Sequence, residues 1–244
     1  MKNPPLDCKA FFFDAEGTLF RARGSVGEIY ARVAESHGVR ADPKVLDVRF
    51  RETLASRFPP GPAMDSHERN KKEKDGWKVL VATVFYGLGS FRNFDAFFDD
   101  VFDAFRGGKG WELYPDTMAA LEFLSSRGLR MGIISNFDFR LEGVVAALGI
   151  LGHFEVLVTP GQSGVCKPDP KIFQFALDAL GVQPSHAVHV GDSIASDVAG
   201  AQASGITPIL VDRGHQHRAA PGVIKISTLE DLRRVTKTGL SYED

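Results

Sequence analysis

Five short apolar runs recur along the chain, each bounded by Gly, Pro, Asp or Ser. Each run is shorter than a typical helix and is rich in β-branched or aromatic residues, so the pattern predicts buried β-strands. These strands are expected at residues 10–13, 129–134, 154–158, 187–190 and 208–211.

Helical periodicity alternates with the later strands. Apolar residues recur at helical spacing in four segments, and a glycine stands just past each one, as expected at a helix C-terminus. The segments are residues 116–126, 141–148, 170–180 and 195–203, followed by Gly128, Gly149, Gly181 and Gly205. Alternating strands and helices indicate right-handed βαβ units and a doubly wound parallel sheet of the α/β class.

Residues 21–110 interrupt this alternation. Helical periodicity occurs four times, and no convincing run of strand type separates the segments, which are residues 29–34, 45–54, 77–85 and 94–105. We therefore expect an all-helical domain at 21–110, inserted after the first strand of an α/β core that comprises residues 1–20 and 111–244.

The charge of the chain is nearly balanced. Its 244 residues include 29 Lys and Arg against 31 Asp and Glu, a formal net charge of −2. Binding to a polyanion requires a concentrated basic face, so the sequence predicts no nucleic-acid partner. With 43% hydrophobic residues, a chain of this length can bury a substantial core without disulfide bonds.

The cysteines and the apolar runs also indicate the cellular compartment in which the protein is expected. The two cysteines, Cys8 and Cys166, form no disulfide framework, which favours a reducing environment. No apolar run reaches the ~18 residues that a membrane-spanning helix needs. Residues 1–9 carry two prolines and an acid rather than the features of a signal peptide. We expect a cytoplasmic protein with no membrane partner.

Polar residues follow several of the predicted strands. In open parallel sheets, ligands bind beyond the carboxyl ends of the strands, so the residues after each apolar run are the candidates for a site. They are Asp14, Glu16, Ser135, Asn136, Lys167, Asp192 and Asp197.

Each of these residues also has a structural explanation. An acid could cap the turn after its strand, Ser135 with Asn136 could form an Asx-type turn, and Lys167 could lie on the surface. Asp169, directly before Pro170, is a good helix N-cap. Their joint position at the strand ends of one sheet favours a single chemistry instead.

That chemistry is phosphoryl transfer. Two acids with a Mg²⁺ ion can hold and neutralise a phosphate, a lysine can offset the remaining charge, and a serine hydroxyl with nearby backbone amides can bind phosphoryl oxygens. A carboxylate can also act as the nucleophile and form an aspartyl-phosphate. Asp14, the first acid of the set, is the candidate nucleophile.

Four ordered segments resemble the motifs of the haloacid dehalogenase superfamily: residues 14–19 (DAEGTL), 133–136 (IISN), 167–170 (KPDP) and 191–197 (GDSIASD). The resemblance spans about residues 9–212. It implies a Rossmann-like core with a helical cap of the superfamily's first class after the first motif. More narrowly, residues 135–149 (SNFDFRLEGVVAALG) resemble the subgroup called haloacid dehalogenase-like hydrolase domain-containing protein 3.

The resemblance implies a set of metal ligands. Asp14 would be both the nucleophile and a Mg²⁺ ligand, Glu16 would bind the metal through its backbone carbonyl, and Asp192 would bind it through a carboxylate. Asp197 would be a further ligand through water, or would support its neighbours.

The resemblance also implies how the substrate is held. Ser135, with the backbone amide of Asn136, would bind the phosphoryl group, and Lys167 would steady both the nucleophile and the substrate charge. Phosphatases of the superfamily usually have an aspartate at the position of Glu16, which acts as general acid and then as general base. The longer glutamate can overshoot a geometry that tolerates errors of about 1 Å poorly. We therefore expect Mg²⁺ binding with reduced or atypical turnover.

Two alternatives accompany the hydrolysis of a small phosphomonoester as the predicted function. A 2-haloacid dehalogenase has a similar first motif and needs no metal, but its last motif lacks an acid at the position of Asp192. Alternatively, Glu16 marks a protein that binds a phosphate-bearing ligand with little turnover. The sequence determines neither the substrate nor the oligomeric state.

Overall fold

The computed structural model describes residues 8–55, 66–215, 217 and 223–238. Part of the N-terminal segment on which the signal-peptide argument depends, residues 1–7, lies outside the described residues. The chain forms two compact units. The α/β unit comprises Met1–Arg21, Leu113–Phe137 and Gly149–Asp244, and the helical unit comprises Ala22–Glu112 and Asp138–Leu148.

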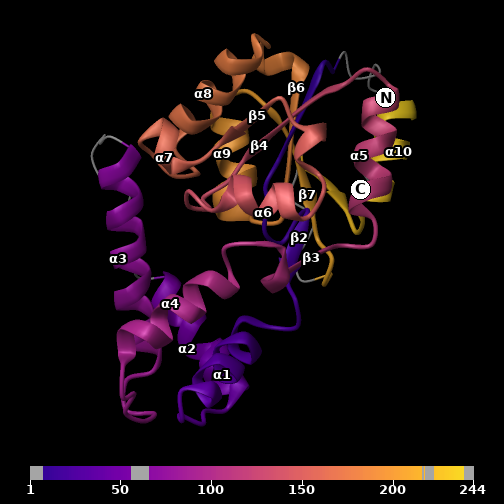
Figure 1. The fold of residues 1–244 in the computed structure, drawn as a ribbon. Helices are drawn as coiled ribbons and strands as arrows, with labels where there is room; N and C mark the ends of the chain where they lie inside the picture. The colour runs from indigo at the N-terminus through magenta and orange to yellow at the C-terminus, as the bar shows by residue number, and fades with distance from the viewer. Residues whose placement is uncertain (1–7, 56–65, 216, 218–222, 239–244) are drawn as a thin grey trace. The chain divides into compact units, whose positions relative to one another are not determined.

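A six-stranded sheet forms the centre of the α/β unit, with the strand order β5-β4-β1-β6-β7-β8 (Figure 1). All neighbouring strands are parallel. The strands are β1 Ala10–Phe13, β4 Arg130–Ile134, β5 Val156–Val158, β6 Ala187–Gly191, β7 Thr207–Val211 and β8 Ile224–Ile226. The apolar runs predict the first five. They miss β8, an edge strand of three residues whose middle residue, Lys225, is exposed.

Helices cover both faces of this sheet, with α8 and α9 on one side and α5 and α10 on the other (Figure 1). Phe173 and Leu177 of α8 pack with Phe12 and Ile134 of the sheet in one buried cluster. The helices of this unit are α5 Thr117–Ser126, α7 Pro160–Ser163, α8 Pro170–Leu180, α9 Ala199–Ala203 and α10 Leu232–Thr238. The doubly wound α/β fold is therefore confirmed.

The helical unit is built around aromatic side chains. Tyr30, Phe85 and Phe97 are buried, and the rings of Phe91 and Phe97 stack with centroids 3.9 Å apart. Such aromatic pairs add to the stability that their buried area supplies. Its helices are α1 Val26–Ser36, α2 Pro43–Ala55, α3 Ser66–Val84, α4 Phe94–Ala104 and α6 Leu141–Ala147.

The chain passes between the two units at two short strands, and it does so again at either end of a later segment, Asp138–Leu148. β2 Phe20–Ala22 and β3 Trp111–Leu113 form a two-stranded sheet at the ends of the predicted insertion, where no strand was expected. Asp138–Leu148 also groups with the helical unit. The domain limits expected from the sequence, with the insertion at 21–110, stay a prediction. No helix in the described part of the chain is long and apolar enough to cross a membrane.

Candidate active site

Three neighbouring strands bring polar residues to one edge of the sheet. Phe13 of β1 is level with Ile133 of β4 and Val190 of β6. Because the strands are parallel, the residues that follow them emerge on the same side, as they do in other open α/β sheets. Asp14 begins this edge, and its N–H donates to the carbonyl of Val190 at 2.9 Å.

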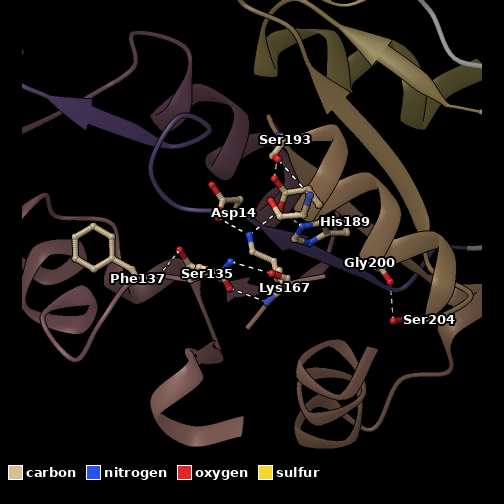
Figure 2. Close-up of polar contacts among 11 residues, drawn as sticks. Asp14, Ser135, Phe137, Lys167, His189, Ser193, Gly200 and Ser204 are labelled. Atoms are coloured by element: carbon tan, nitrogen blue, oxygen red, sulfur yellow. Dashed lines mark hydrogen bonds and ion pairs between the residues drawn. The ribbon is translucent and has the colours of Figure 1, made fainter. Parts of the chain in front are cut away.

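Lys167 reaches the centre of this edge from the loop between α7 and α8 (Figure 2). Its Nζ donates to Asp14 Oδ1 at 2.5 Å and to Asp197 Oδ1 at 2.6 Å, and its side chain is 2% exposed. Burial alone would lower the pKa of Lys167, but the charges of Asp14 and Asp197 outweigh burial and raise it. Lys167 is therefore a buried cation, and its interpretation as a surface lysine is wrong.

The side chain of Asn136 holds the backbone of Lys167. The N–H of Lys167 donates to Asn136 Oδ1 at 2.7 Å, and Asn136 Nδ2 donates to the Lys167 carbonyl at 3.1 Å. The Lys167–Pro168 peptide bond is cis. Asp169 then caps α8, with Pro170 in its first turn, which confirms the structural interpretation of Asp169. Because the Asn136 side chain is engaged by Lys167, its backbone amide is the group that would contact a phosphoryl oxygen.

Ser135 is buried at the end of β4. Its Oγ accepts a hydrogen bond from the N–H of Phe137 at 3.2 Å, a local turn contact of the kind expected for serine here (Figure 2). Accepting this bond uses one lone pair of the hydroxyl, and its O–H can still donate to a ligand oxygen.

Three carboxylates gather around Lys167. Asp14, Asp192 and Asp197 each present one oxygen, and these oxygens lie within 4.8 Å of one another. Burial raises the pKa of Asp14 to about 6; Lys167 opposes this, and the charges of Asp197 and Asp192 add to it. Burial and then the charge of Asp197 raise the pKa of Asp192 to about 6. One ammonium thus faces three acids and cannot neutralise them all.

Asp197 accepts hydrogen bonds at both carboxylate oxygens. Oδ1 accepts from Lys167 Nζ and from His189 Nε2 at 2.9 Å, and Oδ2 accepts from the N–H of Ser193 at 3.0 Å. Burial favours the neutral acid, but Lys167 and His189 together hold the pKa of Asp197 well below its usual range. Asp197 is therefore an anion held by protein donors.

Sequence reasoning missed His189. It lies within β6, in a run that was interpreted as a buried strand, and it is itself buried. The signal in the sequence was a single ionisable residue in an otherwise apolar run (AVHVG). Only the fold shows that its ring reaches Asp197, eight residues further along the chain.

Two glycines are needed where acids approach the backbone. Gly17 has a φ of +90°, and a Cβ built on it would lie 2.3 Å from Asp192 Oδ2. A Cβ on Gly191 would lie 2.2 Å from Asp197 Cγ. Any larger residue at either position would push an acid out of place, so these glycines bring the acidic cluster together.

Glu16 lies in the turn after β1, two residues from Asp14. Loss of hydration beside the surrounding protein, and then the charge of Asp14, raise the pKa of Glu16 to about 7. The residue keeps a solvent-exposed surface, so water screens part of this effect. A carboxyl of this kind holds a proton closer to neutral pH than a free glutamate does.

The acidic cluster has the chemistry of a divalent-cation site. Carboxylate oxygens are the ligands that Mg²⁺ and Ca²⁺ prefer, and Asp14 and Asp192 present them on one side of the sheet edge. Burial, together with the charges of neighbouring acids, raises the pKa of both groups. A cation bound between them would favour their ionised forms.

Comparison with known proteins identifies the family. Residues 8–205 match the sequence model of haloacid dehalogenase-like hydrolases. The chain belongs to this hydrolase family. It is 34% identical over 209 residues to the haloacid dehalogenase-like hydrolase domain-containing protein 3 of Danio rerio, a match that covers 82% of this chain and 84% of that protein. The family and the subgroup expected from residues 135–149 are thereby confirmed.

Solved structures of the family share its fold. A haloacid dehalogenase-family phosphatase from Thermococcus onnurineus superposes with a TM-score of 0.66 and 26% identity, over 94% of this chain and 98% of that one. The L-2-haloacid dehalogenase of Xanthobacter autotrophicus superposes with a TM-score of 0.72 and 21% identity, over 96% and 100%. At that identity the second match shows the fold alone. The fold of this chain is therefore shared by a phosphatase and by a dehalogenase.

Proposed function

We propose that this hydrolase is a Mg²⁺-dependent phosphatase that acts on a small phosphomonoester through an aspartyl-phosphate at Asp14. One observation carries the proposal: the carboxylate of Asp14 touches the Lys167 ammonium and also lies within 4.8 Å of the carboxylate oxygens of Asp192 and Asp197. A nucleophile, a fixed cation and a cation-binding acid thus meet at one point, as phosphoryl transfer requires.

Asp14 and Asp192 would hold the Mg²⁺ ion through carboxylate oxygens, and Glu16 would add its backbone carbonyl. When bound, the ion supplies positive charge to the phosphoryl oxygens of the substrate. Asp197 would support the site rather than bind the ion directly, because Lys167, His189 and Ser193 already donate to both of its oxygens.

The protein residues would carry out two displacements. In the first, a carboxylate oxygen of Asp14 attacks phosphorus and the ester P–O bond breaks, while Glu16 gives its proton to the departing alcohol oxygen. Lys167 and the Ser135 hydroxyl stabilise the phosphoryl charge. In the second, Glu16 takes a proton from water, the water oxygen attacks phosphorus, and the Asp14–phosphorus bond breaks to release inorganic phosphate.

The raised pKa of Glu16 supports this role, because a general acid must hold its proton near the working pH. The side chain is one methylene longer than the aspartate usual at this position in phosphatases of the superfamily. We expect its geometry to limit turnover.

The acidic cluster favours a phosphatase over a dehalogenase. Burial, and then the charges of Asp197 and Asp192, raise the pKa of Asp14 even though Lys167 opposes them; a further cation would favour the ionised nucleophile. The likeness to the Thermococcus phosphatase, at 26% identity over almost the whole chain, points the same way. A cytoplasmic location and the lack of nucleic-acid and membrane partners stay predictions of the sequence.

The test is a panel of small phosphomonoesters assayed with Mg²⁺ and with EDTA, using wild type and Asp14→Asn. We expect hydrolysis that needs both Mg²⁺ and Asp14, together with a hydroxylamine-sensitive phosphoryl label on the wild type. Chloride release from a 2-chloro acid in EDTA would show a dehalogenase instead. Phosphate-ester binding without any label or turnover would show a binding protein.

A further inference from the structure

We infer that His189 is a positioning residue whose imidazole N–H holds the Asp197 carboxylate, so that the Lys167 ammonium stays shared between Asp197 and Asp14. The inference rests on the proposed function, because Asp14 and Lys167 are assigned their roles there. It adds a residue that lies outside the four motifs of the sequence.

The ring of His189 is buried between the sheet and α8. Its residue is 1% exposed and is level with Phe12 of β1 and Pro208 of β7. The imidazole meets the ring of Phe173 edge to face, with centroids 5.1 Å apart and an interplanar angle of 85°. An apolar residue would suit these surroundings, so packing alone does not explain a histidine here.

The hydrogen bond to Asp197 determines which nitrogen carries the proton. An ionised carboxylate only accepts, so His189 Nε2, 2.9 Å from Asp197 Oδ1, must be the donor. In the neutral ring Nδ1 then presents a lone pair, and among the described residues this buried atom has no hydrogen-bond partner. An unpaired buried polar atom is unfavourable. The hydrogen bond from Nε2 to Asp197 therefore explains why a histidine occupies this position.

Asp197 Oδ1 is shared by two donors, Lys167 Nζ at 2.6 Å and His189 Nε2 at 2.9 Å. The N–H of Ser193 holds the other oxygen. Without the imidazole donor, Lys167 alone would compensate Oδ1, and the carboxylate could rotate about its remaining contacts. The ammonium would then move toward Asp197 and away from Asp14. The chemical step should suffer more than substrate binding.

A matched pair of variants tests this contact. In His189→Gln the amide Nε2 can reach Asp197 as the ring Nε2 does, whereas His189→Met has similar volume and no donor. We expect His189→Met to lower kcat by about 10- to 100-fold, the range for supporting residues, with KM changed less than about twofold. His189→Gln should recover most of this loss.

A double-mutant cycle separates positioning from general destabilisation. In an Asp197→Asn background, His189→Met should lower kcat by less than about twofold, because the partner charge is already gone. The inference is overturned by equal loss in His189→Gln and His189→Met, by independent losses in the cycle, or by wild-type kcat in His189→Met.

A measurement without turnover keeps the inference testable if the methionine variant does not fold or if the phosphatase proposal fails. Long-range ¹H–¹⁵N NMR correlations of the wild-type protein report the tautomer of His189. A proton on Nε2 supports its donation to Asp197. A neutral ring protonated on Nδ1 contradicts it, whatever reaction the protein catalyses.

Discussion

Among the described residues, each unit of this hydrolase contains one buried Lys or Arg side chain, and the charges of the two are compensated differently. In the helical unit, Arg140 Nε and Nη2 donate to the two oxygens of Asp138 at 2.9 and 2.6 Å. Its guanidinium carbon lies 4.9 Å from the ring centre of Trp77 and 4.3 Å from that of Phe102. In the α/β unit, Lys167 faces three carboxylates whose oxygens lie within 4.8 Å of one another.

The difference separates a structural ion pair from a candidate reaction site. Arg140 and Asp138 form a close pair of opposite charges, and Trp77 Nε1 also donates to Asp138 at 2.5 Å, so the start of α6 is joined to α3. The Lys167 cluster keeps an excess of negative charge, which a bound cation can use. The pair holds the fold together, whereas the cluster carries the proposed chemistry.

Replacing one acid of the Lys167 cluster and, separately, the acid of the Arg140 pair should give the largest difference in activity. Asp14→Asn should lower phosphomonoester hydrolysis by about 10⁴-fold or more, because it removes the nucleophile. Asp138→Asn should instead lower stability and leave kcat per folded molecule within about tenfold, since it breaks a structural pair. Rates normalised to folded protein by circular dichroism check both. A reversed order of the two effects would contradict the comparison.

Substitution of Glu16 should have the next largest effect on the hydrolysis rate. Glu16→Ala should lower the hydrolysis rate by about 10²- to 10⁴-fold through loss of general acid–base catalysis. Glu16→Asp should raise the rate, because it restores the shorter side chain usual in phosphatases of the superfamily. Steady-state kinetics on the best ester of the panel measure both. An unchanged rate in Glu16→Ala would remove this residue from the mechanism.

Substitutions of Arg140 and Asp138 in the helical unit should have coupled effects on stability. Arg140→Met leaves the Asp138 charge buried without its partner, so the free energy of unfolding should fall by about 3–5 kcal/mol. Adding Asp138→Leu removes that charge and should recover most of the loss. Urea unfolding of the three variants measures this. If the double variant is no more stable than Arg140→Met, the pair does not act as a unit.

Metal addition should act on the α/β unit alone. Saturating Mg²⁺ at 100 times its Kd should stabilise the wild type by about 2.7 kcal/mol, and Asp192→Asn should lose most of this gain. The Arg140→Met variant should keep it, because that pair lies outside the cluster. Thermal melts with Mg²⁺ or EDTA check the prediction. Equal stabilisation of wild type and Asp192→Asn would exclude Asp192 as a ligand.

The smallest effect is a pH dependence in EDTA. The folded-state pKa of Asp192 is raised from 3.8 to about 6, so its ionised form costs stability as pH rises through this window. Asp192→Asn removes the cost. Its melting temperature relative to wild type should therefore increase between about pH 4 and pH 6 and level off above. A gap that narrows with rising pH would have the wrong sign.

The sequence predicted the α/β core because its strands are buried on both faces and read as apolar runs. It predicted less well where local signals are weak. β2, β3 and β8 have three residues each and went unrecognised. The helix expected at 195–203 begins as a π-helical turn, Ile194–Val198, before α9. A wider turn of this kind often marks a functional position.

The candidate site shows the same limit. Asp14, Ser135 and Asp192 could be placed from the sequence, because each follows a strand of one parallel sheet. The reach of Lys167 to Asp14, 153 residues away, could be inferred only through resemblance to a family. The use of the Asn136 side chain on the Lys167 backbone, and the contact of His189 with Asp197, had no local signal.

The sequence by itself determined the α/β class and the polar residues at the strand ends, and it predicted a helical insertion. These depend on periodicity and chain order, which are local properties. Only the tertiary structure decided that one lysine faces three acids, and that a buried histidine of β6 contacts one of them. Burial and charge balance depend on distances between segments far apart in the chain, and those distances exist only in the folded protein.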